Sequence, residues 1–164
     1  MVNKIVVLGV SGSGKSTIGQ KLADSLGYPF FDGDNFHSAN NVDKMRQGIP
    51  LSDQDRETWL TTLNQLMKSE TTAVVACSAL KPKYRALLKQ GNPGLVFVYL
   101  KGDFDTIWER HQKRDGHYFN GKDMLASQFS TLVEPSATEA ILIDIHQDVE
   151  RVLASVLQRL QPSS

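Results

Sequence analysis

Short runs of apolar, largely β-branched residues recur along the chain and are separated by longer segments of mixed polarity. These runs occupy residues 4–8, 28–31, 72–77, 95–100 and 140–143. The central runs are apolar nearly throughout, which is typical of strands that are covered on both faces rather than on one. The pattern therefore predicts five strands, most of them buried inside the protein.

The segments between these runs carry apolar residues at helical spacing. One helical face is formed by Ile18, Leu22 and Leu26. Two more are formed by Trp59, Leu60, Leu63, Leu66 and Met67, and by Val149, Val152, Leu153, Val156, Leu157 and Leu160. Ser52 followed by Asp55 predicts a capping box at the start of the middle helix. Strands that alternate with helices predict an α/β fold with a parallel sheet, helices on both faces and right-handed crossovers.

Two polar stretches do not fit this alternation. They occupy residues 35–50 and 113–122, and the second reads KRDGHYFNGK. We interpret both as insertions at one end of the sheet, the end where ligands bind in an open α/β sheet. Because 164 residues is the size of one ordinary domain, we expect a single domain over residues 1–164.

Charge and cysteine content narrow the class of protein. The chain has 18 Lys plus Arg and 18 Asp plus Glu, and a neutral chain is a poor candidate for coating nucleic acid or acidic membranes. Its one cysteine, Cys77, cannot form an internal disulfide and favours a reducing compartment. No apolar run approaches the roughly 20 residues of a membrane span, and the N-terminus does not read as a signal peptide. We therefore expect a soluble, cytoplasmic protein.

A glycine-rich segment between the first strand and the first helix carries the clearest chemical signal. Residues 9–16 read GVSGSGKS and satisfy the pattern G-x-x-x-x-G-K-[ST]. The glycines let backbone N–H groups turn inward around phosphate, and the helix adds the positive end of its dipole. The alternative is a glycine-rich surface turn, but few such turns lie between a buried strand and an amphipathic helix. The segment is therefore predicted to be a phosphate loop.

This phosphate loop predicts a nucleoside triphosphate, here ATP, together with Mg²⁺. Lys15 is expected to reach the β and γ phosphates, and the hydroxyl of Ser16 to hold Mg²⁺. The expected nucleotide contacts are Gly9, Val10, Ser11, Gly12, Ser13, Gly14, Lys15, Ser16 and Thr17.

Two acidic residues follow the second predicted strand, in the segment Phe31-Asp32-Gly33-Asp34. A doubly wound sheet places them beside the phosphate loop. Asp34 is a candidate base for an attacking hydroxyl, and Asp32 is a candidate to hold Mg²⁺ through water, although these roles could be exchanged. The alternative is an Asp-Gly-Asp turn with solvated carboxylates. The position next to a phosphate loop favours the catalytic interpretation.

An ordinary Walker B carboxylate is missing from the sequence, since the third strand ends in Cys77-Ser78. The guanine-reading pattern Asn-Lys-x-Asp is missing too. These features favour a small-molecule kinase over a motor or a GTPase.

Basic residues gather in or beside the two insertions, although any one of them alone is more typical of a surface residue. They are Lys44, Arg46, Arg56, Lys81, Lys83 and Arg85 beside the first, and Arg110, Lys113, Arg114 and His117 beside the second.

Six further segments accompany the phosphate loop. They are DGDNFH at 32–37, NVDKM at 41–45, GIPLSDQDRETWL at 48–60, CSALKPKYR at 77–85, YLKGDF at 99–104 and SQFSTLVEP at 127–135. The phosphate loop alone is shared with many unrelated proteins, but the combination of segments is far more specific. Over nearly the whole chain, this combination resembles gluconate kinase (gluconokinase) of the small bacterial type.

The resemblance implies a P-loop NTPase fold of the nucleoside-monophosphate-kinase-like type, a three-layer sandwich with a five-stranded parallel sheet and a mobile lid. It implies an acceptor-side insertion at residues 35–70 and a lid at residues 113–122. It also implies phosphorylation of D-gluconate by ATP on the terminal hydroxyl, which gives 6-phosphogluconate and ADP. Members are usually dimers, so a homodimer is expected.

Candidate roles follow from this substrate, a carboxylate joined to a chain of hydroxyls. A bidentate Arg suits a carboxylate, and Arg56 is the first choice. Arg110 and Arg114 are expected to contact the nucleotide, and Arg114 also to act in catalysis with Lys15 and Asp34. The expected substrate contacts are Asp34, His37, Arg56, Ser78, Lys81 and His117.

Two alternatives stay open from the sequence. One is another small-molecule kinase of the same fold, such as a shikimate or nucleoside-monophosphate kinase, which the segments PLSDQDR and CSALK disfavour. The other is a non-catalytic module that uses ATP occupancy as a switch, which the intact Lys15, Ser16 and acidic pair disfavour.

Overall fold

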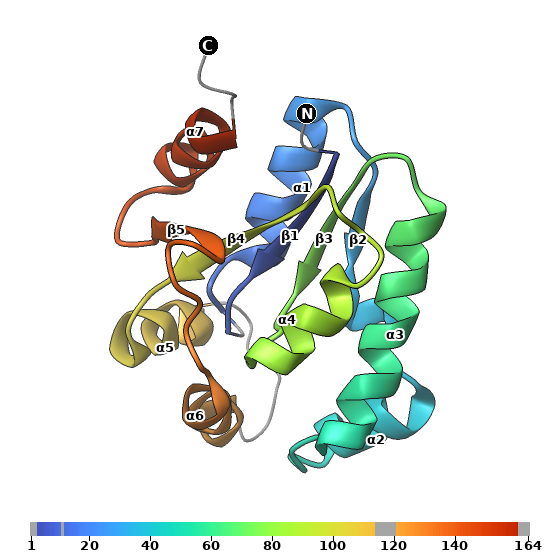
Figure 1. Ribbon diagram of the computed structural model, residues 1–164. Coiled ribbons are helices and arrows are strands. Elements are labelled where there is room, and N and C mark those ends of the chain that lie inside the picture. Colours follow the sequence, from blue (N-terminus) through green and yellow to red (C-terminus); the bar gives the residue numbers. More distant parts are fainter. Residues whose placement is uncertain (1–2, 11, 114–120, 161–164) are drawn as a thin grey trace.

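A five-stranded parallel sheet forms the centre of the computed structural model, which describes residues 3–10, 12–113 and 121–160 (Figure 1). The strand order is β2-β3-β1-β4-β5, and every neighbouring pair is parallel. The strands are β1 (Lys4–Leu8), β2 (Phe30–Asp32), β3 (Ala73–Cys77), β4 (Leu95–Lys101) and β5 (Ala140–Asp144). The predicted α/β class and five-stranded parallel sheet are confirmed.

Helices cover both faces of this sheet. One face is covered by α1 (Lys15–Leu26) and α7 (Val149–Leu160), and the other by α3 (Asp53–Ser69) and α4 (Pro82–Lys89). The short 3₁₀ helix η1 (Gly33–Phe36) and α2 (Ala39–Arg46) follow β2. The pair α5 (Phe104–Lys113) and α6 (Gly121–Thr131) pack together toward the carboxyl ends of the strands (Figure 1). None of the described helices is long and apolar enough to cross a membrane.

The central strand β1 shows why its sequence is apolar at successive positions. Ile5 and Val7 face the cluster that includes residues of α1 and α7, whereas Val6 and Leu8 face the cluster that includes residues of α3 and α4. All four side chains are buried. Successive side chains of a strand point to opposite faces of the sheet, and both faces are covered here, so every position of β1 from Ile5 to Leu8 must be apolar.

The second strand differs from its prediction at both ends. It was expected at residues 28–31 but is observed at Phe30–Asp32. Helix α1 ends at Gly27, whose φ of 72° is left-handed, and the N–H of Tyr28 donates to Ala23 O at 2.9 Å. Tyr28 is therefore part of the helix end, and the strand begins only after Pro29. The capping box is confirmed, because the Ser52 and Asp55 side chains bond each other's backbone N–H groups.

Arg85 ties α4 to the chain that leads into β5. Only 1% of its side chain is exposed, and its Nε donates to Glu139 Oε2 at 2.9 Å. Its guanidinium also donates to the carbonyl oxygens of Ala79 at 3.0 Å and Val133 at 2.9 Å. The sequence grouped Arg85 with basic residues near the acceptor side, but its donors are used in joining two segments of the fold.

Replacing this buried cation with an apolar residue is expected to destabilise the protein. Arg85→Met leaves the Ala79 carbonyl without its donor inside the protein, so the free energy of unfolding should fall by about 2 kcal/mol or more. Chemical denaturation measures this loss. The matched control is Arg151→Met, since Arg151 is 77% exposed and pairs only weakly with Asp148 at 3.8 Å. A surface change of that kind should stay within about 0.5 kcal/mol, and equal losses for the two variants would contradict the account.

Candidate active site

The loop between β1 and α1 has the backbone shape that phosphate binding requires. Gly12 and Gly14 have left-handed φ values of 84° and 95°. A Cβ atom on Gly9 would lie 2.4 Å from Ser13 Oγ, so the tight turn excludes a larger residue there. Gly14 is the N-cap of α1 and has no side chain to cover the first-turn N–H groups, which have no partners within the helix. A helix N-terminus that follows such a glycine turn favours an anion.

Lys15 and Ser16 project from the first turn of α1. The ammonium of Lys15 donates to Val10 O at 3.1 Å, so it lies across the loop. The Ser16 hydroxyl donates to Asp32 Oδ2 at 2.8 Å. The other oxygen of the same carboxylate accepts from the backbone N–H of Asp34 at 3.0 Å. Asp32 therefore joins the phosphate loop to the segment that carries Asp34.

The pair formed by Ser16 and Asp32 fits Mg²⁺. Both residues present hard oxygen atoms, and Mg²⁺ at phosphate sites takes one or two protein oxygens and completes its shell with phosphate and water. Within residues 3–10, 12–113 and 121–160, no group of three or more His, Cys, Asp and Glu is arranged to hold a metal ion. The donor set thus resembles a nucleotide-dependent metal site rather than an all-protein cage.

The 3₁₀ helix η1 is held close to β3 and to α3. A Cβ atom on Gly33 would lie 2.5 Å from Ala76 O, so only glycine allows this approach. On the other side, the buried indole of Trp59 donates from Nε1 to Gly33 O at 2.7 Å. These two contacts fix the backbone immediately before Asp34. The sequence placed Trp59 only on the apolar face of a helix and missed this hydrogen bond, because nothing local marks it.

His37 lies in the same group of side chains. Its ring stacks on Trp59 with the centroids 4.1 Å apart and the planes 20° from parallel. Its Nδ1 is 3.3 Å from the amide nitrogen of Asn41. Burial lowers the pKa of His37; the nearby Asp34 carboxylate opposes this and the Arg56 cation adds to it. The structure thus brings three predicted substrate residues, Asp34, His37 and Arg56, within electrostatic reach of one another.

Arg56 is held by the ring of Tyr84. Its Nη1 donates to the Tyr84 hydroxyl at 3.2 Å, and its guanidinium carbon lies 5.7 Å from the ring centre. The Tyr84 hydroxyl in turn donates to the Asp53 carboxylate. Lys83 and Lys81 reach that carboxylate at 2.6 and 3.2 Å. Hydrogen bonds from Lys83, Tyr84 and Lys81, in that order, hold the pKa of Asp53 well below its usual range.

This cluster carries a positive surplus. Three cations, Arg56, Lys81 and Lys83, lie within 5.8 Å of the Tyr84 ring centre. Asp53 is the carboxylate that Lys81 and Lys83 share. The direct partner of Arg56 is a neutral phenol, so its charge stays available to an anion. The predicted substrate residue Lys81 forms an ion pair with Asp53 at 3.2 Å. Tyr84 and Asp53 were missed by the sequence reading, because their contacts join positions about thirty residues apart.

Lys44 forms an ion pair within residues 35–70, the predicted acceptor-side insertion. This segment and the residues packed against it from α4 are called the acceptor side below. The Lys44 ammonium lies 2.7 Å from Asp55 Oδ2, and this hydrogen bond, with a smaller contribution from the Ser52 backbone, lowers the pKa of Asp55 to about 2. Asp55 is also the capping-box residue of α3. The contact joins α2 to the first turn of α3.

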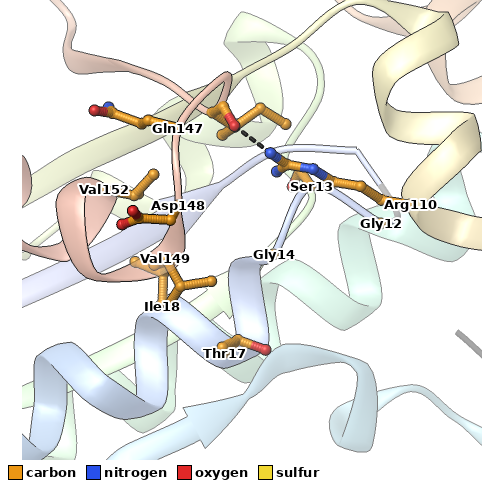
Figure 2. A pocket seen from close by; sticks show the side chains of 11 residues that line it. Gly12, Ser13, Gly14, Thr17, Ile18, Arg110, Gln147, Asp148, Val149 and Val152 are labelled. Carbon is orange, nitrogen blue, oxygen red and sulfur yellow. Dashed lines mark hydrogen bonds between the residues drawn. The ribbon is translucent and has the colours of Figure 1, made fainter. Parts of the chain in front are cut away.

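A cavity of about 460 Å³ opens beside the phosphate loop (Figure 2). Figure 2 shows the guanidinium of Arg110 reaching from α5 to the chain after β5, where it donates to the carbonyl of Ile145. The lining combines apolar side chains with backbone of the loop, which suits a flat base and its sugar phosphate. Its residues are Gly12, Ser13, Gly14, Thr17, Ile18, Arg110, Ile145, Gln147, Asp148, Val149 and Val152.

The cavity includes predicted and unpredicted residues. Gly12, Ser13, Gly14, Thr17 and Arg110 were expected at the nucleotide. The contribution of the segment after β5 was missed. The one feature of the sequence that could have predicted this contribution is the position of the segment directly after the carboxyl end of a strand, where ligands bind in such sheets.

Three predicted site residues, Ser11, Arg114 and His117, lie outside the residues that the structure describes, and so does most of the expected lid. Ser78 follows the end of β3 and is half-buried. Its neighbour Cys77 is fully buried, and desolvation raises the pKa of its thiol to about 12. Cys77 therefore packs as an uncharged thiol at a strand end, as expected.

Comparisons with known proteins identify the family and the fold. A family model described as shikimate kinase matches residues 11–161. The thermoresistant gluconokinase of Escherichia coli strain K12 is 46% identical over 159 residues, which cover 93% of this chain and 90% of that protein. The crystal structure of a gluconokinase from Sinorhizobium meliloti 1021 is 40% identical, with a TM-score of 0.90 over 96% of this chain and 90% of that one. Shikimate kinase from Aquifex aeolicus, 20% identical with a TM-score of 0.62 over 96% of this chain and 95% of that one, shares the fold.

Proposed function

This chain belongs to the gluconokinase branch of the shikimate kinase family, and we propose that it transfers the γ-phosphoryl group of ATP to the terminal hydroxyl of D-gluconate. The products are 6-phospho-D-gluconate and ADP. The observation that carries the proposal is the bridge at Asp32, whose carboxylate bonds the phosphate-loop Ser16 with one oxygen and the N–H of Asp34 with the other. It sets a candidate base for an acceptor hydroxyl next to a phosphate site.

The chemistry is an in-line displacement. The hydroxyl oxygen of gluconate forms a bond to the γ-phosphorus as the bond to the β–γ bridging oxygen breaks, and the hydroxyl proton passes to Asp34. Lys15 and the N–H groups at the start of α1 stabilise the negative charge on the phosphoryl oxygens. A bound Mg²⁺ would neutralise the β and γ phosphates, and Ser16 and Asp32 are the residues that would hold it.

Recognition of gluconate is assigned to the acceptor side. The positive surplus around Tyr84 supports Arg56 as the partner of the substrate carboxylate, because a guanidinium can meet a carboxylate with two parallel hydrogen bonds. Asp34 and His37 contact the hydroxyl chain. Ser78 and Lys81 are proposed at the same chain from their position after β3.

The nucleotide is assigned to the cavity beside the phosphate loop. Arg110 lines that cavity, which supports its role at the nucleotide. The proposed lid at residues 113–122 would bring Arg114 to the transferred phosphoryl group and His117 to the substrate. The family resemblance also supports a homodimer that works in the cytoplasm.

A panel of acceptors tests the proposal directly. The purified chain with MgATP is expected to release ADP with D-gluconate at a far higher kcat/KM than with shikimate or with a nucleoside monophosphate. A coupled ADP assay measures the rates, and phosphorus NMR identifies the phosphorylated carbon. Turnover of shikimate or a nucleotide without turnover of gluconate would reject the assignment. ATP consumption that no acceptor stimulates would instead favour a nucleotide switch.

Removing the proposed base should slow the chemical step. Asp34→Asn keeps the size of the side chain and its backbone bond to Asp32 but cannot accept the proton, so kcat should fall by roughly 10² or more. Steady-state kinetics gives kcat, and titration with an ATP analogue checks that nucleotide affinity stays near the unsubstituted value.

The matched comparison is Arg56→Lys, which retains the charge but loses the bidentate fork. It should raise the KM for gluconate and leave nucleotide affinity unchanged. Near-normal turnover in Asp34→Asn would remove Asp34 as the base, and an unchanged KM in Arg56→Lys would remove Arg56 as the carboxylate partner.

A further inference from the structure

The ring of His37 is held in one orientation. It stacks on Trp59 with the ring centres 4.1 Å apart, and Trp59 is itself fixed through its hydrogen bond to Gly33 O at 2.7 Å. One ring nitrogen, Nδ1, is directed at the amide nitrogen of Asn41 at 3.3 Å. Which ring nitrogen of His37 carries the proton therefore depends on whether the Asn41 amide presents its NH₂ group or its oxygen to Nδ1.

The orientation of the Asn41 amide is set by a backbone carbonyl. The same amide nitrogen, Nδ2, lies 3.1 Å from Asp55 O. A carbonyl oxygen can only accept a hydrogen bond, so the NH₂ end of the amide must face it. Asn41 is 3% exposed, and its own N–H donates to Ser38 Oγ at 3.1 Å, so the residue is fixed at both ends. An NH₂ group has two hydrogens, and the second is directed to His37 Nδ1.

We propose that Asn41 is a positioning residue that holds His37 as the neutral Nε2–H tautomer, so that His37 gives the acceptor substrate a hydrogen-bond donor and not a base. This inference rests on the proposed function for the identity of the substrate. A nitrogen that accepts a hydrogen bond carries no proton, and in a neutral imidazole the proton must then sit on the other nitrogen. His37 Nε2–H thus donates to a hydroxyl oxygen of the polyol chain.

The surrounding charges agree with a neutral ring. Burial is the main cause that lowers the pKa of His37 and so disfavours the imidazolium; the Asp34 carboxylate acts in the opposite direction, and the Arg56 cation adds to the lowering. Lys44 and Asp55, which face the same region from α2 and α3, neutralise each other as an ion pair at 2.7 Å. The proton of the attacking hydroxyl is therefore left to Asp34, and His37 fixes the position of the substrate.

The tautomer can be read from the free protein. A long-range proton–nitrogen correlation spectrum of the ¹⁵N-labelled full chain at neutral pH distinguishes a protonated from an unprotonated ring nitrogen. The chain has four histidines, and His37→Gln identifies the resonances of His37 by their loss. The proposal expects the proton on Nε2 and an unprotonated Nδ1. A proton on Nδ1, or an imidazolium at neutral pH, would overturn it.

A kinetic variant tests the consequence for the substrate. Asn41→Asp places an acceptor against Nδ1. At a pH high enough to keep the ring neutral in this variant, the proton is drawn to Nδ1 and Nε2 changes from donor to acceptor. The KM for gluconate should rise by about tenfold, as expected for one lost hydrogen bond that leaves a polar group unpaired, while the KM for ATP stays unchanged.

Asn64→Asp is the matched control. The Asn64 amide is buried too and donates to Leu87 O, Leu88 O and Gln90 O at 2.8–3.1 Å, at the end of α4. The Asn64→Asp substitution places a carboxylate against these carbonyl oxygens. It should lower the free energy of unfolding without raising the KM for gluconate. Equal KM changes in both variants would overturn the positioning role.

The spectrum keeps the two proposals separable. It is recorded on the unsubstituted protein without any substrate, so it stands even where Asn41→Asp fails to fold. An Nε2–H tautomer in a chain that does not phosphorylate gluconate would reject the substrate but support the role of Asn41. An Nδ1–H tautomer in an active gluconokinase would reject the role of Asn41 alone.

Discussion

The hydrogen bond from the indole of Trp59 to the carbonyl of Gly33 is the interaction on which the acceptor side depends. The 3₁₀ helix that carries Asp34 spans only Gly33–Phe36, and a single short turn has too few bonds of its own to fix a side chain. Gly33 lets this turn approach Ala76 O, and Trp59 holds it there from α3. The same indole supports the ring of His37. One buried side chain thus positions both the proposed base, Asp34, and the proposed substrate donor, His37.

Asp32 connects the segment that carries Asp34 to the phosphate loop. Its carboxylate is shared between the Ser16 hydroxyl and the N–H of Asp34, so the nucleotide side and the acceptor side meet at one residue. Phosphoryl transfer needs its two reactants held in line, and most of its acceleration comes from placement and fixed charge. A rigid link through Asp32 serves that need better than two independently mobile segments. It also accounts for the lack of a carboxylate at the end of β3, because β2 supplies one.

Much of this arrangement could be predicted from the sequence, for a physical reason. Strands buried on both faces are apolar throughout, so β1, β3, β4 and β5 were located within a residue or so of their ends. The phosphate loop and the acidic pair are local motifs, and their neighbourhood follows from sheet topology. The contacts of Trp59, Tyr84 and Asn41 could not be predicted in the same way. The contacts of Trp59 and Tyr84 join residues 26 and 31 positions apart, and the indole N–H is a group that a hydrophobic pattern treats as apolar. Asn41 lies only four residues from His37, but the direction of its amide is set by the distant carbonyl of Asp55.

The central claim is that the Trp59 hydrogen bond sets the acceptor side, whereas the phosphate loop is formed by β1 and α1 and is joined to the acceptor side through Asp32. Trp59→Phe tests it most directly, since it keeps an aromatic ring beside His37 and removes the N–H donor. The measurement is kcat/KM for gluconate together with the dissociation constant of an ATP analogue on the same preparation. The account predicts a fall of about tenfold or more in kcat/KM, from a buried carbonyl left unpaired and a displaced Asp34, with nucleotide affinity unchanged. Unchanged kcat/KM in a folded variant, or an equal loss of nucleotide binding, would contradict it.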